Sequence, residues 1–520
     1  MVGSVRYERT MKVRKVIMKI SFAVCVFLSC CGISLSTGAG VGGGCEPYGG
    51  GDQLMTSAWL DDVGPCVSLY AGSVGGGIQQ PRGLVNSPLT AGDLLVADMG
   101  EKPLENARRR KGENGRIVAL RDMNDDGVIG DDEWIVLARQ KGLNHGIAVH
   151  NGYLFASTSD KIYRWPYEAG QWEDLGDGEL VLYNMDMTGA PGPGGGLSSP
   201  LGHSTRTLIF DKQGRLYVSV GSVGNVDGDS YRSRIRRFGN LSDPDLSAPV
   251  DFTGGEIFAD GLRNEVGLAW ADDKEEVLFG VENGMDNLKR SDLGGDIHND
   301  NPAEELNAFP VDKPGMHYGY PWCFTEYELG SPKAEGRGSQ WALEGQAVAD
   351  DAYCKNPEKN VPPMHSMQSH SAPLGISFYG KDWKQVSECC RGLDVGAEGA
   401  NETDGLTSVN TTSTTTTNSS SCEEIMAVAL PCQYIGNAFV PFHGSWNRDD
   451  PTGYKVVRLA FDEDHSSVKE EEDFIWAGKD GPKWKTGMRP VDVAFGPRGE
   501  MYISSYKSGE ILLVRSQPTQ

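Results

Sequence analysis

Short hydrophobic stretches alternate with polar positions along this chain and are separated by glycine-containing turns. In residues 202–222, for example, the segments TLIF and LYVSV flank the polar turn DKQG, which predicts a β-hairpin. No long segment has the 3.6-residue hydrophobic period of a helix, and glycine is abundant, with 68 residues. The pattern therefore predicts an all-β protein.

One pattern recurs six times: alternating hydrophobic residues, a turn, and a second strand. The copies begin at PRGLVNSPL, NHGIAVHNG, STRTLIFDK, NEVGLAWAD, APLGISFYG and RPVDVAFGP. Repeated antiparallel units predict a propeller or a solenoid, and the irregular spacing between these copies favours a closed ring. We therefore expect a six-bladed β-propeller within residues 41–520, with the repeats covering about 45–516.

The first 40 residues have the character of a targeting segment. Basic residues precede the apolar run ISFAVCVFLSCCGISL, and small residues follow it. The run is short for a membrane span, so residues 1–40 are expected to be a cleaved signal peptide and the protein to be secreted.

Eight cysteines follow the expected signal peptide, and an even number in an oxidising compartment predicts disulfides. Proximity along the chain favours the pairs Cys45–Cys66 and Cys323–Cys354. The remaining four are expected to pair among themselves: Cys389, Cys390, Cys422 and Cys432.

Two insertions interrupt the repeats. Residues 393–422 include a run of threonine and serine, which predicts a disordered, glycosylated loop within the fifth blade. Residues 323–363 are polar and bracketed by cysteines, which predicts a stapled excursion. N-x-Ser/Thr sequons, which fit secretion, begin at Asn240, Asn401, Asn410 and Asn418.

Charge and motifs narrow the function classes. A net charge of −24 argues against nucleic-acid binding, because a phosphate backbone would be repelled. The glycine-rich segment GGGCEPYGGG precedes no helix, so it is not a nicotinamide or flavin fingerprint.

The segment DMNDDGVIGDDE, residues 122–133, matches the calcium-loop pattern, with a glycine at the sharp turn. Its flanks resemble strands rather than the helices of an EF-hand. We therefore expect a structural calcium loop joining two strands; the alternative is an acidic hairpin without metal. The expected ligands are Asp122, Asn124, Asp126, Val128 and Glu133.

The loops GLRNEVG, FHGSWNR and MRPVDV begin or end expected strands. In a propeller such loops converge at the mouth of the central channel. Each arginine alone is also compatible with a solvated or salt-bridged role, but several arginines with a histidine on one face favour an anionic, planar ligand. The residues concerned are Arg263, Asn264, His443, Arg448 and Arg489.

A resemblance to a known family is carried by the segments GHSTRTL, GLRN, ENGM and FHGSWNR. The chain resembles the glucose/sorbosone dehydrogenase family over nearly its whole mature length. That family includes soluble sugar dehydrogenases, among them secreted fungal pyranose dehydrogenases, that use pyrroloquinoline quinone (PQQ). The resemblance implies a six-bladed propeller with PQQ at the axial mouth, assisted by calcium, and oxidation of a sugar by hydride transfer to the quinone.

The resemblance also implies roles for individual residues. His203 matches the family's general base, and Arg263 matches the arginine beside the reactive quinone carbonyl. Asn264 corresponds to a cofactor contact, and Arg489 to a carboxylate-binding arginine. His145, from the similar segment LNHGI, is the rival base.

The resemblance also implies ligands for calcium, and this sequence departs from the family pattern at two positions. Gly284 and Met285 fall where two backbone carbonyls hold the cofactor's calcium. Bacterial glucose dehydrogenases carry a second arginine where this chain has Val491, and their cofactor lysine has no clear equivalent here. Arg448 and His443 are the expected substitutes.

Three function classes follow. The leading one is a secreted PQQ-dependent dehydrogenase that oxidises an aldose, ketose or sorbosone-like sugar and passes electrons to a cytochrome or a small acceptor. The second is a metal-dependent lactonase, which would need several acidic and amide side chains on one axial metal. The third is a non-catalytic binding domain, against which the presence of His203 with Arg263 argues.

Overall fold

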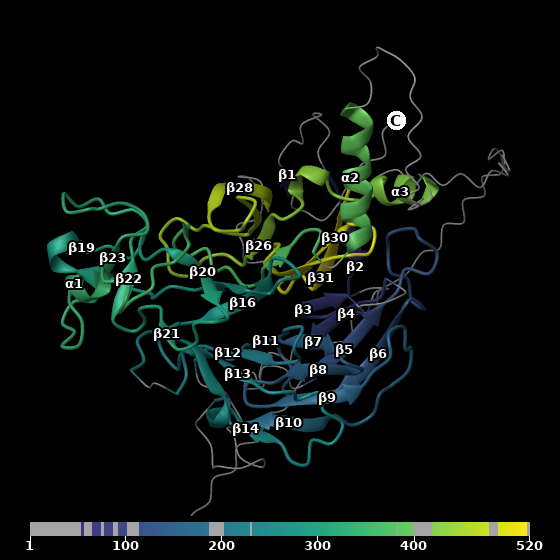
Figure 1. Cartoon of the computed structure of the whole chain (residues 1–520), viewed down its shortest axis with the longest axis horizontal. Coiled ribbons are helices and arrows are strands. Elements are labelled where there is room, and N and C mark those ends of the chain that lie inside the picture. Colours follow the sequence, from purple (N-terminus) through teal and green to yellow (C-terminus); the bar gives the residue numbers. More distant parts are fainter. Residues whose placement is uncertain are drawn as a thin grey trace, which may run out of the picture. The chain divides into compact units, whose positions relative to one another are not determined.

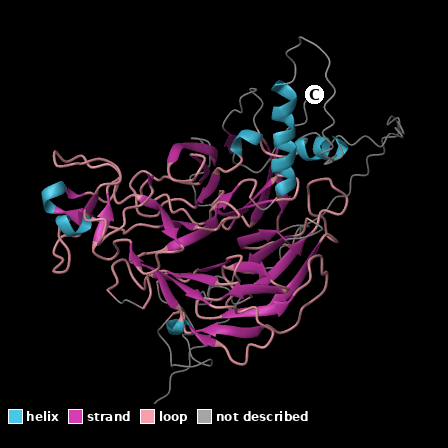
Figure 2. Ribbon diagram, viewed as in Figure 1, coloured by secondary structure: helices cyan, strands magenta, loops and turns pink. Residues whose placement is uncertain are grey.

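The computed structural model describes residues 54–56, 65–73, 77–86, 92–100, 114–186, 202–228, 231–381, 383–398, 419–477 and 487–516. Strands make up most of the regular structure in these ranges, and helices are few (Figure 2). No helix within them is long and apolar enough to cross a membrane. The expected signal peptide lies outside the described residues, as do Cys45 and the sequons at Asn401, Asn410 and Asn418.

Six sheets of four or five strands follow one another along the chain, each beginning at one of the six repeats. Blade one contains β3 (Pro81–Asn86), β4 (Leu94–Asp98), β5 (Arg116–Leu120) and β6 (Trp134–Arg139). Blade two contains β7 (Ile147–His150), β8 (Tyr153–Ser157), β9 (Ile162–Pro166), β10 (Glu179–Tyr183) and β14 (Val250–Asp251). Blade three contains β11 (Arg206–Phe210), β12 (Leu216–Val220), β13 (Arg234–Phe238), β15 (Glu256–Asp260) and β21 (Met316–His317).

The other three blades repeat the arrangement. Blade four contains β16 (Glu265–Trp270), β17 (Val277–Glu282), β20 (Glu304–Pro310) and β24 (His365–Met367). Blade five contains β25 (Ser377–Phe378), β26 (Ala438–Phe442), β27 (Lys455–Phe461), β28 (Val468–Ala477) and β1 (Leu54–Thr56). Blade six contains β29 (Pro490–Phe495), β30 (Met501–Ser505), β31 (Glu510–Arg515) and β2 (Cys66–Ala71). The prediction of a six-bladed β-propeller is confirmed.

Two strands from early in the described chain complete the last two blades. β2 pairs with β31, placing Cys66 opposite Arg515, and Figure 1 shows these two strands side by side. β1 pairs with β28, placing Leu54 opposite Ala477. The ring is therefore closed by backbone hydrogen bonds between segments that are far apart in the sequence.

In four of the six blades the second strand is buried along its whole length. β4, β12 and β30 read LLVAD, LYVSV and MYISS, and every residue in them is buried. Such a strand is covered on both faces by the neighbouring blades, so residues that point to either face lie in a core. This explains why these strands contain continuous apolar runs.

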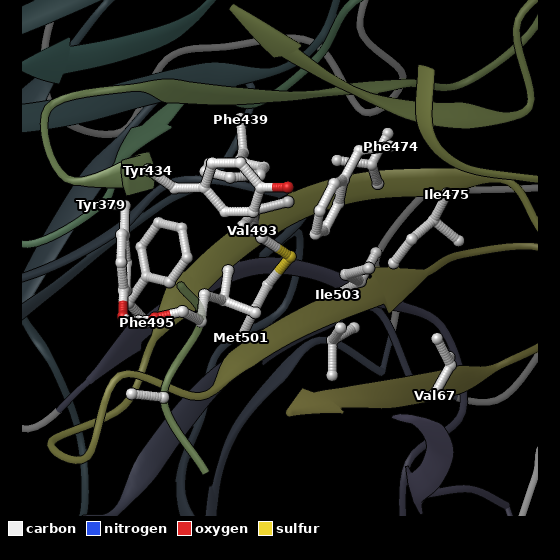
Figure 3. Close-up of a cluster of buried hydrophobic side chains, with 14 of the residues drawn as sticks. Val67, Tyr379, Tyr434, Phe439, Phe474, Ile475, Val493, Phe495, Met501 and Ile503 are labelled. Atoms are coloured by element: carbon white, nitrogen blue, oxygen red, sulfur yellow. Dashed lines mark hydrogen bonds between the residues drawn. The ribbon is translucent and has the colours of Figure 1, made fainter. Parts of the chain in front are cut away.

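Aromatic side chains fill the space between blades five and six. Phe439 and Phe474 of blade five have ring centroids 5.0 Å apart, and Phe439 lies 5.5 Å from Phe495 of blade six. Figure 3 shows these rings around Met501. Removing one such ring typically costs about 3–5 kcal/mol, so this layer holds the two blades together.

The first strands of the blades surround an axial channel of about 390 Å³. Glycines let these strands approach closely: a Cβ at Gly83 or Gly146 would lie 2.3 or 2.1 Å from a carbonyl oxygen of the next blade. Asp492 occupies the corresponding position in blade six, and its Oδ2 accepts a hydrogen bond from the Leu84 amide at 2.8 Å. Asp492 thus links the sixth blade to the first.

The stapled excursion predicted at 323–363 is confirmed. It contains the small sheet of β22 (Cys323–Thr325) and β23 (Gln340–Ala342), followed by α1 (Asp351–Cys354). The Cys323–Cys354 disulfide joins the beginning of the sheet to the end of the helix. A second two-stranded sheet, β18 (Lys289–Arg290) and β19 (Gly295–Asp296), and three 3-10 turns complete the regular elements: η1 (Phe252–Gly254), η2 (Ser291–Leu293) and η3 (Cys432–Tyr434).

The insertion in blade five differs from its prediction at both ends. Residues expected in a disordered loop at 393–422 belong instead to α2 (Lys384–Glu398) and α3 (Ser419–Met426), while 399–418 lie outside the described residues. The adjacent cysteines at 389 and 390 pair with those at 422 and 432, which ties α2 to α3 and to η3. The predicted pairing of these four cysteines among themselves is confirmed. Cys66 is also disulfide-bonded, but its predicted partner is not described.

Candidate functional site

Basic side chains gather where the first strands of the blades begin. Every blade starts with its innermost strand, so these amino ends all lie at the same end of the axis. Arg82 is the second residue of β3, Arg206 is the first of β11, and Arg489 directly precedes β29. We call the following residues the basic cluster: Arg82, His145, His203, Arg206, Arg232, Arg263, His443 and Arg489.

His203 is half-buried and held by the following hairpin. Its amide donates to the Ser222 carbonyl at 3.0 Å, and its Nδ1 lies 3.1 Å from the same oxygen. Nδ1 also lies 3.0 Å from the Ser222 hydroxyl, which donates its own proton to the Gly224 carbonyl at 2.6 Å. Both neighbours of Nδ1 therefore accept, so Nδ1 carries the proton and Nε2 is left with a lone pair. Burial, together with the Arg263 charge, lowers the pKa of His203 to about 3. The ring is therefore a neutral base at ordinary pH.

Arg263 is buried and firmly positioned. Its Nη2 forms an ion pair with Asp286 at 2.8 Å and donates to Asn225 Oδ1 at 3.1 Å, and Nη1 donates to the Asn283 carbonyl at 3.2 Å. Its own amide donates to the Glu282 carboxyl at 2.5 Å. His203 and Asn264, the residue after Arg263, both border Gly221: a Cβ there would lie 2.8 Å from the His203 Cβ and 2.3 Å from Asn264 Oδ1. The charge of Arg263 also lowers the pKa of His203.

Hydrogen bonds connect the site across blades four and five. Asn264 donates to the Asn283 side chain at 2.9 Å, and Asn283 donates to the Pro373 carbonyl at 2.7 Å. The His443 amide then donates to the Ala372 carbonyl at 2.9 Å. The predicted cofactor contacts Asn264 and His443 thus belong to one network.

Arg489 and His443 continue this network into blade six. Arg489 donates to the carbonyls of His443 and Gly444 at 3.1 and 2.8 Å and lies over the Tyr454 ring. No carboxylate among the described residues pairs with it. Burial and the Arg489 charge lower the pKa of His443 to about 3, so the positive charge here belongs to the arginine.

Arg448 differs from Arg489 because its charge is already paired. Its Nη2 lies 2.9 Å from Asp300, and its Nε donates to the Asp450 carbonyl. The sequence-based role of Arg448 in holding the cofactor stays a prediction, and its ion pair would have to open or be shared.

Two members of the basic cluster lie at the channel end, and sequence analysis missed one. Arg82 was not singled out, although it precedes the glycine of the first repeat as His145 precedes that of the second. His145, the rival base, is only 4% exposed, and its Nδ1 has no hydrogen-bond partner among the residues that the structure describes. Burial and the Arg82 charge lower its pKa well below the ordinary value.

The backbone assigned to the cofactor's calcium is tightly placed. The Gly284 amide donates to Glu304 Oε2 at 2.8 Å. A Cβ at Gly284 would lie 2.7 Å from Pro302 and 2.9 Å from the Ala303 carbonyl, so only glycine fits without a shift. Met285 is buried beside this turn.

The loop at 122–133 connects β5 to β6, two strands, as predicted. Its carboxylates accept hydrogen bonds from the loop's own amides: Asp122 from Gly127 at 2.8 Å and Asp126 from Val128 at 2.8 Å. Within the described ranges, no group of three or more histidine, cysteine, aspartate and glutamate side chains is arranged to hold a metal ion. The calcium prediction for this loop therefore stays a prediction.

The chemistry of the cluster fits PQQ, a planar quinone with three carboxylates. Positive charge concentrates at this end of a chain whose net charge is −24. Within the described part of the chain, the guanidinium of Arg489 makes hydrogen bonds only to carbonyls, and the buried Nε of Arg82 makes none. Guanidinium groups without carboxylate partners suit an anionic ligand.

Comparison with known proteins places these features in a family. Residues 69–517 match the model of the TrAA12-like family. The PQQ-dependent pyranose dehydrogenase of Coprinopsis cinerea is 26% identical over 475 residues, 85% of this chain and 53% of that protein. The PQQ-dependent sugar dehydrogenase of Hypocrea jecorina is 30% identical over 323 residues, 58% of this chain and 67% of that protein. The chain thus spans about half the length of the Coprinopsis relative.

Two solved structures have the same fold. The calcium structure of the Trichoderma reesei carbohydrate-active enzyme family AA12 superposes with a TM-score of 0.66 at 23% identity, covering 91% of this chain and 99% of that one. The holo form of the pyranose dehydrogenase PQQ domain from Coprinopsis cinerea gives 0.64 at 24% identity, covering 90% and 98%. The fold and the family match over residues 69–517 agree, and the chain belongs to the TrAA12-like family.

Proposed function

We propose that this protein is a PQQ-dependent oxidoreductase that oxidises a sugar. The observation that carries the proposal is the basic cluster, in which the neutral base His203 lies beside the fixed charge of Arg263. The curated relatives named as PQQ-dependent pyranose and sugar dehydrogenases support it.

Charged side chains and hydrogen-bonding side chains would contact different parts of the cofactor. Arg489 and Arg448 would hold carboxylates of the cofactor, and Asn264 and His443 would donate to or accept from its ring substituents. The Gly284 and Met285 carbonyls would hold a calcium ion beside the quinone. When bound, PQQ supplies a quinone that accepts a hydride from the sugar carbon.

Proton removal is the task of the chain itself. The sugar hydroxyl must lose its proton as the carbon is oxidised, and Nε2 of His203 is the nitrogen available to take it, because Nδ1 is engaged with Ser222. The guanidinium of Arg263 stabilises negative charge that develops nearby, and Asp286 prevents it from moving away.

A structural calcium ion at residues 122–133 would serve a different purpose. This loop lies against blade six: the Ile129 amide donates to the Tyr70 carbonyl at 2.7 Å, and Arg498 pairs with Asp125 at 2.8 Å. Calcium there would stiffen the joint between the first and the last blade.

Secretion is part of the proposal. It is supported by the targeting character of residues 1–40 and by the disulfides that the structure contains. A cytochrome or a small molecule would accept the electrons.

Reconstitution tests the function. The purified protein is titrated with PQQ in calcium by calorimetry and absorbance, and dye reduction is then followed with a panel of aldoses and ketoses. We expect PQQ binding and sugar-dependent reduction. A folded protein that binds no PQQ contradicts the proposal; lactone hydrolysis without PQQ would indicate a lactonase instead.

A further inference from the structure

Arg82 is an arginine at the propeller axis without a carboxylate partner. Its Nε is buried and makes no hydrogen bond within the described part of the chain. Its guanidinium lies over the Tyr506 ring, 5.4 Å from the centroid. Arg263, by contrast, is paired with Asp286 at 2.8 Å. A buried charged N–H donor without an acceptor is costly, so the Nε of Arg82 needs an explanation.

The carboxyl group of Asp492 interacts electrostatically with Arg82, but its oxygens are hydrogen-bonded to backbone amides. Its two oxygens accept hydrogen bonds from the amides of Leu84 and Val493 at 2.8 and 3.0 Å. Burial raises the pKa of Asp492 to about 7, so near neutral pH it carries only part of a charge. Burial lowers the pKa of Arg82 to about 10, which leaves the arginine charged.

Arg82 and Val491 both contact the Tyr506 ring, and Val491 stands where bacterial glucose dehydrogenases carry a second arginine. The Tyr506 ring packs against the apolar group of Val266, Leu374 and Val491. The same ring lies 6.2 Å from the His443 ring, and the charge of Arg82 acts on His443. Arg82 therefore approaches, from blade one, the place where residue 491 of blade six provides no charge.

We propose that Arg82 binds a carboxylate of PQQ and supplies the second guanidinium that Val491 does not. This inference rests on the proposed function. Arg489 in blade six and Arg82 in blade one then hold the anion from adjacent blades, across the joint where the ring closes. An ion pair with the ligand satisfies the orphaned donor of Arg82 and offsets its desolvation.

Calorimetry with two ligands tests the role of the charge. PQQ and its trimethyl ester, which lacks the carboxylate charges, are titrated into the wild type and into Arg82→Met in calcium. We expect Arg82→Met to bind PQQ about 10- to 100-fold more weakly, the range for a charge-assisted hydrogen bond, and to bind the ester as the wild type does. Arg458→Met is the control, because Arg458 pairs with Glu470 and Glu472 on the outer strands of blade five.

The possible outcomes distinguish a failure of the role of Arg82 from a failure of the proposed function. If the folded wild type binds no PQQ, the proposed function fails. If the wild type binds PQQ and Arg82→Met binds it equally well, or loses affinity for both ligands alike, the role of Arg82 is overturned and the function stands. Should Arg82→Met not fold, Arg82→Lys keeps the charge but not the planar fork. Its binding of PQQ must then be weakened selectively, and unchanged affinity for PQQ overturns the inference.

Discussion

The propeller contains two clusters of side chains, one basic and one acidic, and burial affects the charges of the two clusters in opposite ways. One is the basic cluster at the end of the axis. The other is a row in blade four, where Glu265, Glu282 and Glu305 stand opposite one another across β16, β17 and β20. The Asn307 amide donates to a carboxyl oxygen of each, at 3.2, 3.2 and 3.5 Å.

The difference lies in whether the group can give up its charge. Burial raises the pKa of Glu265 and Glu282 well above the ordinary value and that of Glu305 to about 7, so protons neutralise the row without any ligand. Burial lowers the pKa of Arg82 and Arg489, but these guanidinium groups keep their charge near neutral pH. The acidic row is therefore self-sufficient, whereas the basic cluster is complementary to an anion.

Removing the base at the basic cluster should have the largest effect. In the PQQ-loaded protein we expect His203→Gln to lower turnover about 10²- to 10⁴-fold while retaining the cofactor's absorbance, because a positioned base contributes this much. Near-normal turnover of this variant together with an inactive His145→Gln would transfer the role to His145.

The pH dependence of turnover sharpens the same assignment. A base works above its pKa, and that of His203 is lowered to about 3. We expect no loss of wild-type turnover centred near pH 6.5, the ordinary histidine value. A clear inflection there that disappears in His203→Gln would contradict the shift.

Neutralising the acidic row should change how stability depends on pH. The folded pKa of Glu305, about 7, exceeds the unfolded value, so the folded state retains a proton that the unfolded state releases. The free energy of unfolding should fall as pH rises from about 4.5 to about 7, by about 3 kcal/mol for this shift. Urea unfolding of Glu305→Gln should show a fall that is smaller by this amount, because Glu265 and Glu282, whose pKa values burial also raises, still contribute to it. The exposed Glu276→Gln is the control, and an identical pH dependence in all three proteins would contradict the prediction.

Arginines with and without a carboxylate partner should differ in their effect on PQQ affinity. We expect Arg489→Ala to weaken binding by about 1–3 kcal/mol, the range for charge-assisted hydrogen bonds. Arg448→Ala should cost less, because Arg448 already pairs with Asp300. Calorimetry showing a larger loss for Arg448→Ala would reverse the ranking.

The smallest effect is expected at the exposed acidic loop 122–133, where solvent already screens the like charges. Asp126→Ala should lower the melting temperature in calcium by about 1 °C, equivalent to about 1 kcal/mol for a domain of this size, and leave PQQ affinity unchanged. Chelation of the wild type should have the same effect. A melting temperature that neither change moves would identify the loop as an acidic hairpin without metal.

Local pattern was sufficient to predict the propeller. Each of the six repeats places its hydrophobic residues on the first two strands of one blade, and blade count follows from counting repeats. The motifs that contain His203, Arg263, Asn264 and His443 were recognisable through the family resemblance, and the roles assigned to these residues stay predictions.

Other features depend on contacts between distant segments, which no local pattern contains. The orphaned Nε of Arg82 is visible only once blade six is placed against blade one. Glu265, Glu282 and Glu305 are separate in sequence and meet only through strand register. The helices α2 and α3 were missed because low-complexity residues separate them in the sequence, whereas a disulfide joins them in the fold and a second ties α2 to η3.

The pairing of β2 with β31 has a consequence for biosynthesis. Because Cys66 pairs opposite Arg515, β2 leaves the ribosome long before its partner exists. At about 5–20 residues per second, roughly 20–90 s pass before that edge is covered. During this interval an open strand edge is available to other chains, and blade six is incomplete. Slower translation would lengthen this exposure, so the yield of folded protein should be limited by the synthesis of the last strand rather than by the first blades.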